Sequence, residues 1–296
     1  MDTIRFDSRV VVVTGAGRGL GRAYALALAE RGANLVLIDN GCAADGTGTD
    51  SSLVHEVAEM IRGLDGNALP IFADVTDFEQ MQQAINLAVS QFGKVTDIVA
   101  NAGVLIQCSI DSGKAPLTKM MEVNHFGSLN IMKAAMSQIQ QHQGKIVLTG
   151  GLSGLYGDDR LASYASSMMA NRGLMLSVSQ HMEEFGGKCN LLCPSANTRM
   201  VSELFTEHQR RQLEVSAVVP ALLYLLSDFA PNGMTVTASA GHFSLAKTVE
   251  SRTVKMLPGD LRPEALCQAW RDTGPDLHMT QYSSFGDRFK KLFNWG

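Results

Sequence analysis

Residues 10–21 read VVVVTGAGRGLG, and this stretch decides the fold. Four consecutive valines predict a strand that is buried on both faces of a parallel sheet. The glycines that follow predict a tight loop, and the Ala- and Leu-rich residues 22–31 predict a helix that ends at Gly32. A strand, a glycine-rich loop and a helix in this order are typical of the first unit of a nucleotide-binding α/β sheet.

Strands and helices then alternate along the chain. We expect further strands near residues 34–38, 68–73, 97–100, 144–149, 188–193 and 235–238, with the strand at 188–193 ending at Pro194. We expect further helices near residues 52–64, 78–92, 119–140 and 162–185. This alternation predicts an α/β protein with a doubly wound parallel sheet, the Rossmann fold, in a single domain with a C-terminal tail.

The tail differs in pattern from the rest. We place a dinucleotide-binding domain at residues 1–250 and a helical C-terminal extension at residues 251–296. Residues 263–270 and 285–293 predict helices, and the second has phenylalanines on one face and charged residues on the other. We expect this extension to pack on its own subunit or on a partner subunit, with membrane contact as the weaker alternative.

Composition excludes several classes of protein. The chain has 296 residues, is 45% hydrophobic and carries a formal net charge of −4, which gives no electrostatic footprint for nucleic acid. No apolar run reaches the roughly 18–20 residues that span a bilayer, and the N-terminus lacks the apolar core of a signal peptide. The five cysteines show no paired spacing, which favours reduced thiols in a cytoplasmic protein over a metal site.

The glycine loop has the chemistry of a phosphate site. Gly15 permits a positive φ, and Gly19 and Gly21 let the backbone approach a pyrophosphate at the N-terminus of the helix. Asp39, at the end of the second strand, is placed to accept a hydrogen bond from a ribose 2′-OH and would repel a 2′-phosphate, which favours NAD(H) over NADP(H). Arg18 weakens that preference because its cation can pair with a phosphate. The glycine-rich residues 41–49 lie either beside the adenosine or on the plain surface.

Five motifs together resemble the short-chain dehydrogenase/reductase family over about residues 5–250. They are the glycine loop that begins at Thr14, Asp74-Val75, Asn101-Ala102-Gly103, Asn124 and Tyr164. Within the family the likeness is greatest to the (3R)-hydroxyacyl-CoA dehydrogenase domain of peroxisomal D-bifunctional multifunctional enzymes. This likeness rests on FDSRV at 6–10, GLGRAYAL at 19–26, DGTG at 45–48, GLYG at 154–157 and Arg199-Met200.

The resemblance implies a cofactor site for NAD. Asp74 and Val75 would contact the adenine, Asn101 would support the central sheet, and Thr198 would bind the nicotinamide carboxamide. The full set of implied cofactor residues is Gly15, Arg18, Gly19, Leu20, Gly21, Asp39, Asp74, Val75, Asn101, Ala102, Gly103 and Thr198. The resemblance also implies acyl-CoA thioesters or steroid-like molecules as substrates.

The catalytic positions depart from the family pattern. The family uses a tyrosine as proton donor or acceptor, a lysine four residues later that lowers the tyrosine's pKa, and a serine that holds the substrate oxygen. An asparagine positions a water that links the lysine to bulk solvent. Here Tyr164 and Asn124 are present, but the serine position is Gly151 and the lysine position is Met168. Because a thioether carries no charge, we expect turnover to be slowed by several orders of magnitude.

Two functional classes remain open. The chain is either an NAD(H)-binding relative with a degenerate site and a structural or regulatory role, with an active paralogue as a candidate partner, or an active oxidoreductase on a 3-hydroxyacyl-CoA or steroid-like substrate. In the second case Tyr164 would work with a substitute partner, for which Ser153 and Arg172 are the candidates. We also expect Tyr156 to line the substrate pocket. The family's interface predicts a homodimer or homotetramer through residues 119–140 and 162–185.

Overall fold

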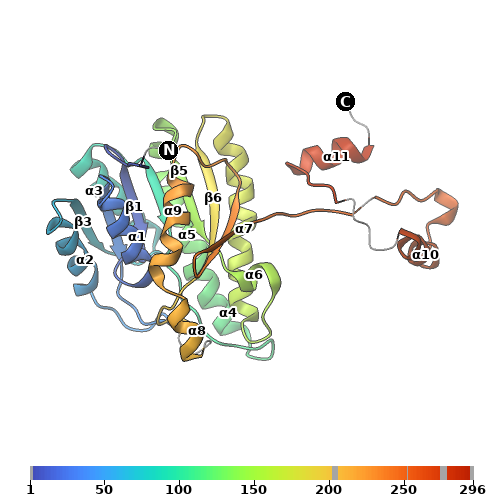
Figure 1. The fold of residues 1–296 in the computed structure, drawn as a ribbon, viewed down its shortest axis with the longest axis horizontal. Coiled ribbons are helices and arrows are strands. Elements are labelled where there is room, and N and C mark those ends of the chain that lie inside the picture. Colours follow the sequence, from blue (N-terminus) through green and yellow to red (C-terminus); the bar gives the residue numbers. More distant parts are fainter. Residues whose placement is uncertain (1–2, 202–205, 252, 274–278, 294–296) are drawn as a thin grey trace. The chain divides into compact units, whose positions relative to one another are not determined.

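The protein forms one central sheet with helices on both faces (Figure 1). The computed structural model describes residues 3–201, 206–251, 253–273 and 279–293. Contacts divide the chain into two compact units, Met1–Leu245 and Ala246–Gly296, whereas the boundary expected from sequence lay after residue 250. No described helix combines the length and the apolar composition that crossing a membrane requires.

The sheet of the first unit has the strand order β3-β2-β1-β4-β5-β6-β7-β8. Strands β1 to β7 pair in parallel, which confirms the doubly wound parallel sheet. Val12 in the centre of β1 pairs with Val36 on one side and Ile98 on the other. The strands are β1 Val10–Thr14, β2 Asn34–Asp39, β3 Asn67–Phe72, β4 Asp97–Ala100, β5 Lys145–Thr149, β6 Lys188–Ser195, β7 Thr235–Ser239 and β8 His242–Ala246.

Two hydrophobic cores, one on each face, hold the helices to the sheet. One face packs against α3 (Phe78–Phe92), α5 (Gly127–Gln141) and α7 (Ala162–Glu183). The other face packs against α1 (Gly19–Ala29), α2 (Ser52–Arg62) and α9 (Val219–Leu226). The remaining helical segments of this unit are α4 Lys114–Met120, the π-helical Met121–Phe126, α6 Leu152–Tyr156, α8 Glu207–Gln212 and the 3₁₀ turn Val215–Val218.

The predicted helix over 119–140 differs from the structure in its start and in its centre. Helical backbone begins at Lys114, directly after Gly113 with a φ of 75°. The centre, Met121–Phe126, is π-helical, and such a turn releases backbone carbonyls that side chains must then satisfy. A π-turn has no local sequence signal here, because the groups that stabilise it come from elsewhere in the fold.

The end of the sheet also differs from the prediction. The strand expected to stop at Pro194 continues to Ser195, and Pro194 pairs with Ala238. Proline is tolerated there because β5 ends opposite Leu192, so β6 has a neighbour on one side only. Strand β8 was not predicted. It follows β7 through Ala240 and Gly241, whose φ values of 47° and 76° suit a two-residue hairpin.

A buried ion pair between Arg9 and Asp97 lies at the amino ends of β1, β4 and β5. Asp97 is fully buried at the start of β4, where it accepts hydrogen bonds from Arg9 Nε at 2.7 Å, from Thr96 Oγ1 at 2.7 Å and from the Lys145 backbone N–H at 3.1 Å. A second Arg9 nitrogen also bonds its carboxylate. Arg9 further donates to the Leu226 carbonyl at 3.3 Å, which links the end of α9 to the sheet.

The second unit contains both helices predicted for the tail, α10 (Pro263–Thr273) and α11 (Phe285–Phe293), with a 3₁₀ turn at Pro258–Asp260. Glu250 and Thr280 exchange two backbone hydrogen bonds of 2.8 and 2.9 Å. The Glu250 carboxylate also pairs with Arg288 of α11 at 2.6 Å. These contacts join Glu250, near the start of the second unit, to Thr280 and to α11.

Candidate active site

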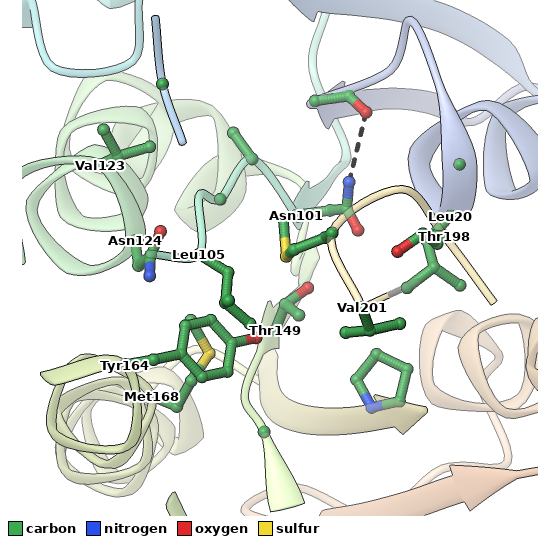
Figure 2. A pocket seen from close by; sticks show the side chains of 18 of the residues that line it. Leu20, Asn101, Leu105, Val123, Asn124, Thr149, Tyr164, Met168, Thr198 and Val201 are labelled. Atoms are coloured by element: carbon green, nitrogen blue, oxygen red, sulfur yellow. Dashed lines mark hydrogen bonds between the residues drawn. The ribbon is translucent and has the colours of Figure 1, made fainter. Parts of the chain in front are cut away.

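A cavity of about 570 Å³ lies at the carboxyl ends of the parallel strands, where α/β sheets hold their ligands (Figure 2). The sixteen residues predicted for the site come together there, and all of them except Gly21 line the cavity. Those that line it are Gly15, Arg18, Gly19, Leu20, Asp39, Asp74, Val75, Asn101, Ala102, Gly103, Asn124, Gly151, Tyr164, Met168 and Thr198.

The glycine loop is packed too tightly for side chains. A Cβ on Gly21 would lie 2.0 Å from the Gly15 carbonyl oxygen, so this glycine acts by letting α1 approach the loop rather than by facing the cavity. A Cβ on Gly15, whose φ is 66°, would lie 2.8 Å from the Ala102 Cα atom. Gly19 has a φ of 51°, and a Cβ there would lie 3.3 Å from the Thr198 Cγ2 atom. The loop therefore leaves a bare backbone cradle at the N-terminus of α1, which suits a pyrophosphate.

Asp39 is held in place before any ligand arrives. One carboxylate oxygen accepts a hydrogen bond from the Gly17 N–H at 2.7 Å, and the other accepts from the Gly41 N–H at 2.6 Å. Each oxygen keeps a lone pair with which it can accept a ribose hydroxyl. Arg18 lies 3.8 Å from the Asp50 carboxylate, so its cation already has a partner of opposite charge. Both arrangements favour a 2′-hydroxyl over a 2′-phosphate.

The glycine-rich insertion after β2 takes part in the site. The carbonyl of Cys42 accepts a hydrogen bond from the Arg199 guanidinium, and the carbonyl of Ala44 accepts from the Leu105 N–H at 2.9 Å. The insertion is therefore bound to the segments that follow β4 and β6. Because Cys42 and Gly46 also line the cavity, the insertion forms part of its wall and is more than a plain surface loop.

Asn101 and Asp74 have structural partners around the cavity. The Asn101 side chain donates to the Thr14 carbonyl at 3.0 Å, and the Thr14 hydroxyl accepts the Asn101 N–H at 3.0 Å, so β1 and β4 are joined where they end. Asp74 accepts hydrogen bonds from the Thr76 N–H at 2.9 Å and from the Asn40 side chain at 3.2 Å. Both side chains therefore hold neighbouring segments of the cavity wall together.

The three key catalytic positions lie against one another. A Cβ on Gly151 would be 3.3 Å from Tyr164 Cε1 and 3.1 Å from Met168 Cγ. Tyr164 and Met168 are one turn apart on α7, and Figure 2 shows both side chains extending from that helix. Burial, followed by the nearby Cys193, raises the pKa of Tyr164 to about 12. The phenol is therefore neutral throughout the physiological range.

Asn124 is buried, and both ends of its amide are hydrogen-bonded. Its Oδ1 atom accepts the Val104 N–H at 2.7 Å, and its Nδ2 atom donates to the Val104 carbonyl at 3.0 Å and to the Ser167 hydroxyl at 3.0 Å. The side chain thus clamps the segment after β4 to α7. Both N–H groups of this amide are therefore engaged, and Oδ1 accepts one hydrogen bond.

Comparison with known proteins assigns the chain to a family. Residues 9–209 match the family described as short chain dehydrogenase. The chain belongs to the short-chain dehydrogenase family.

Its similar relatives within this short-chain dehydrogenase family include multifunctional enzymes. The chain is 32% identical over 272 residues to peroxisomal multifunctional enzyme A of Dictyostelium discoideum, an alignment that covers 90% of this chain and 60% of that protein. It is 32% identical over 276 residues to peroxisomal multifunctional enzyme type 2 of Mus musculus, with 89% of this chain and 37% of that protein covered. The chain thus spans 60% or less of the length of these two relatives, and it lies close to the D-bifunctional branch of the family.

Solved structures give the same fold and a cofactor. Full-length peroxisomal multifunctional enzyme type 2 from Drosophila melanogaster has a TM-score of 0.80 at 24% identity, with 98% of this chain and 49% of that chain covered. Carveol dehydrogenase from Mycobacterium avium in complex with NAD has a TM-score of 0.74 at 25% identity, with 81% and 99% covered. The bare glycine cradle and Asp39 fit NAD.

The expected substitutes for the missing short-chain dehydrogenase residues fall in different places. Ser153 lines the cavity from α6. The charge of Arg172 acts on the pKa of Cys193, which burial raises to about 12, whereas burial and Cys193 account for the pKa of Tyr164. The prediction that Tyr156 lines the pocket is wrong: its side chain is 76% exposed and lies outside the cavity lining. Helix α6 is only five residues long, and Tyr156 is its last residue, directly before Gly157.

Asn171 is a site residue that sequence reasoning missed. Its Nδ2 atom donates to the backbone carbonyls of Asn124 at 2.9 Å and of Thr149 at 3.0 Å. Its Oδ1 atom accepts from His125 Nδ1 at 3.0 Å, which requires that this ring nitrogen carry the proton. The side chain therefore joins the end of β5, the π-helical segment and α7 beneath the cavity. A signal existed, because Asn171 shares the buried face of α7 with Tyr164 and is polar.

Proposed function

We propose that this protein binds NAD(H) in the cavity, transfers hydride slowly or not at all, and serves a structural or regulatory role. One observation carries the proposal: Gly151, Tyr164 and Met168 meet in one place and supply only one polar group. The frame around them, from the glycine cradle to Asn124, is intact. An intact cofactor site beside a depleted catalytic cluster supports binding without efficient turnover.

The chemistry of the missing groups gives the size of the effect. NAD(H), when bound, supplies the hydride acceptor or donor. The chain must move a proton at the substrate oxygen, and Tyr164 is its one candidate among the three catalytic positions. Its raised pKa disfavours the phenolate, and Met168 offers no charge to restore it. Since general acid–base catalysis contributes about 10²–10⁴-fold, the family reaction is slowed by at least a comparable factor.

The alternative function is an active NAD-dependent oxidoreductase on a 3-hydroxyacyl-CoA or steroid-like substrate. The names of the multifunctional relatives and the position of Ser153 in the cavity lining support this alternative. The deciding experiment measures NADH affinity by calorimetry and turnover on 3-hydroxyacyl-CoA substrates in one preparation. Tight NADH binding with negligible turnover supports the first function. Turnover that disappears in Tyr164→Phe establishes the alternative.

The position of Asp39 predicts the choice of cofactor. We expect NADH to bind more tightly than NADPH, because Asp39 accepts the 2′-OH and repels a 2′-phosphate. In Asp39→Ala the difference between the two affinities narrows by about tenfold or more, since a charged hydrogen bond and a repulsion are both lost. Calorimetric titration with both cofactors measures it. Equal affinities in the wild-type protein would contradict the role of Asp39. They would indicate that Arg18 pairs with the 2′-phosphate of NADPH.

The helices expected to form an interface carry exposed apolar side chains. Phe126 and Leu129 near the start of α5, and Met169 and Leu176 on α7, are exposed in the single chain. We propose a homodimer or homotetramer through these helices, and we expect light scattering at micromolar concentration to give more than one chain.

The matched test of this interface places one charge on each helix. Leu129→Glu combined with Leu176→Glu should produce a monomer with an unchanged far-ultraviolet spectrum, because a carboxylate does not desolvate at an apolar interface. Leu87→Glu on α3, also an exposed leucine, should leave the assembly intact. A wild-type monomer, or an assembly that survives the double change, would refute this interface.

The remaining parts of the proposal concern location and partners. We propose a cytoplasmic protein with a small-molecule acyl-CoA or steroid-like ligand, no nucleic-acid or membrane partner, and an active paralogue as a candidate partner. The two relatives described above are named as peroxisomal, so imaging of a tagged chain decides between the compartments. We also propose that residues 251–296 pack on their own or a partner subunit.

A further inference from the structure

Asp39, Asp74 and Arg18 line the part of the cavity near the ends of β1, β2 and β3. The glycine cradle lies next, and Thr149, Gly150, Gly151, Tyr164 and Met168 line the cavity around the catalytic positions. Asp158 and Arg160, an ion pair of 3.0 Å that precedes α7, also belong to the lining. A dinucleotide that places its adenosine at Asp39 and its pyrophosphate on the cradle must extend its nicotinamide towards the catalytic positions. This step rests on the proposed NAD(H) binding.

The side chains next to position 151 carry no charge. Gly150 and Gly151 have no side chains, and Met168 presents a buried thioether. The pKa values of Tyr164 and Cys193 are each raised to about 12, so the phenol and the thiol are both neutral at physiological pH. Arg172, whose charge is felt at Cys193, is the cation of α7 that follows Met168 by one turn.

The two redox forms of the cofactor differ in charge at the nicotinamide. The oxidised nicotinamide ring is a cation, whereas the reduced ring is neutral. A lysine at position 168 would place an ammonium near that ring and repel the oxidised form. Met168 removes this repulsion, because its side chain carries no charge and takes the place of that lysine beside Gly151.

We propose that Met168 makes the site selective for the oxidised dinucleotide, so that the protein holds NAD⁺ at least as tightly as NADH. A hydrogen bond from a lysine at position 168 to the cofactor's ribose would be the same for NAD⁺ and for NADH. Such a bond therefore cancels in the ratio of the two affinities. The ratio therefore reports the charge beside the ring and little else. A protein with this property takes up NAD⁺ or releases it as the cellular ratio of NAD⁺ to NADH changes. NAD⁺ would then be the ligand through which the proposed regulatory role operates.

The test measures the dissociation constants of NAD⁺ and NADH by calorimetry in three proteins. They are the wild type, Met168→Lys and the neutral control Met168→Leu. We expect the wild type and Met168→Leu to share one affinity ratio. In Met168→Lys the ratio should shift against NAD⁺ by about tenfold to a hundredfold, which corresponds to two unit charges roughly 6 Å apart at an effective dielectric of about 20.

Each outcome decides one point. A Met168→Lys protein that melts like the wild type and keeps the wild-type ratio overturns the role of Met168. Should the lysine variant fail to fold, the wild type alone still decides, because NADH bound more tightly than NAD⁺ overturns the selectivity. If neither form binds, the proposed function itself fails, and this result is distinct from binding with the opposite preference.

Discussion

Replacing Gly151 by serine and Met168 by lysine in one chain is expected to raise turnover on 3-hydroxyacyl-CoA substrates by about 10²–10⁴-fold. The lysine places a cation one helical turn from Tyr164 and lowers the pKa of the phenol, which burial holds near 12. The serine places a hydroxyl beside the same ring, because the Cβ position of residue 151 lies 3.3 Å from Tyr164 Cε1. Steady-state kinetics with saturating NAD⁺ measures the effect.

The two changes act on one transition state, so their effects should not add. We expect each single variant to recover less than a tenth of the rate of the double variant. Adding Tyr164→Phe to the double variant is the control, and it should abolish the recovered rate. Robust wild-type turnover that disappears in Tyr164→Phe would show instead that another group, such as Ser153, already supplies the missing function.

The surroundings of residue 168 limit this recovery. Met168 is only 4% exposed, so an ammonium at this position would be largely removed from water. A buried charge without partners destabilises the fold. Thermal melting with and without NADH separates this loss of stability from a loss of catalysis. We expect NADH to restore part of the stability, since it binds the folded state alone.

Arg9→Met is expected to lower the free energy of unfolding by about 3–5 kcal/mol, because it leaves a buried carboxylate without its cation. Asp97 has no exposed surface and keeps only the bonds from Thr96 and the Lys145 backbone after the change. Methionine preserves most of the arginine's aliphatic length, so the lost packing is small. Urea unfolding followed by circular dichroism measures the difference.

The matched control is a second arginine–aspartate pair of similar geometry. Arg5 bonds both oxygens of Asp7, but the two side chains are 54% and 60% exposed. Arg5→Met should therefore change the unfolding free energy little, since water solvates both groups once they separate. Equal effects of the two substitutions would show that burial of Asp97 does not govern the strength of its pair.

The sequence predicted the elements whose signals are local. Strands β1 and β4 are runs of buried apolar residues, and both are found as expected. Helix α3 has the bounds that were predicted, because the Asp77 side chain caps its first turn at 3.1 Å and Gly93 ends it with a φ of 78°. The cofactor loop was predicted from its place between a buried strand and a helix, whereas Tyr164 was identified through the resemblance to the family.

The parts that escaped prediction depend on contacts between distant segments. The π-helical segment is stabilised by Asn171, which lies 47 positions from Asn124 along the chain. Strand β8 begins after an Ala-Gly turn, which is a weaker signal than Asn-Gly or Asp-Gly. Thr149 lines the cavity because β5 ends there, and the exact end of a strand is set by its neighbours. Such features appear only when the whole sheet is assembled.

The contact between positions 151 and 168 has an evolutionary consequence. A serine introduced at position 151 alone would bring its Cβ to 3.1 Å from Met168 Cγ, so the thioether would have to move. A lysine introduced at position 168 alone would meet no hydroxyl at Gly151. Each step alone recovers only a small part of the activity of the double change, and each carries a cost in packing or in buried charge. Full catalysis therefore requires both substitutions, and selection that acts on one mutation at a time favours neither of them strongly.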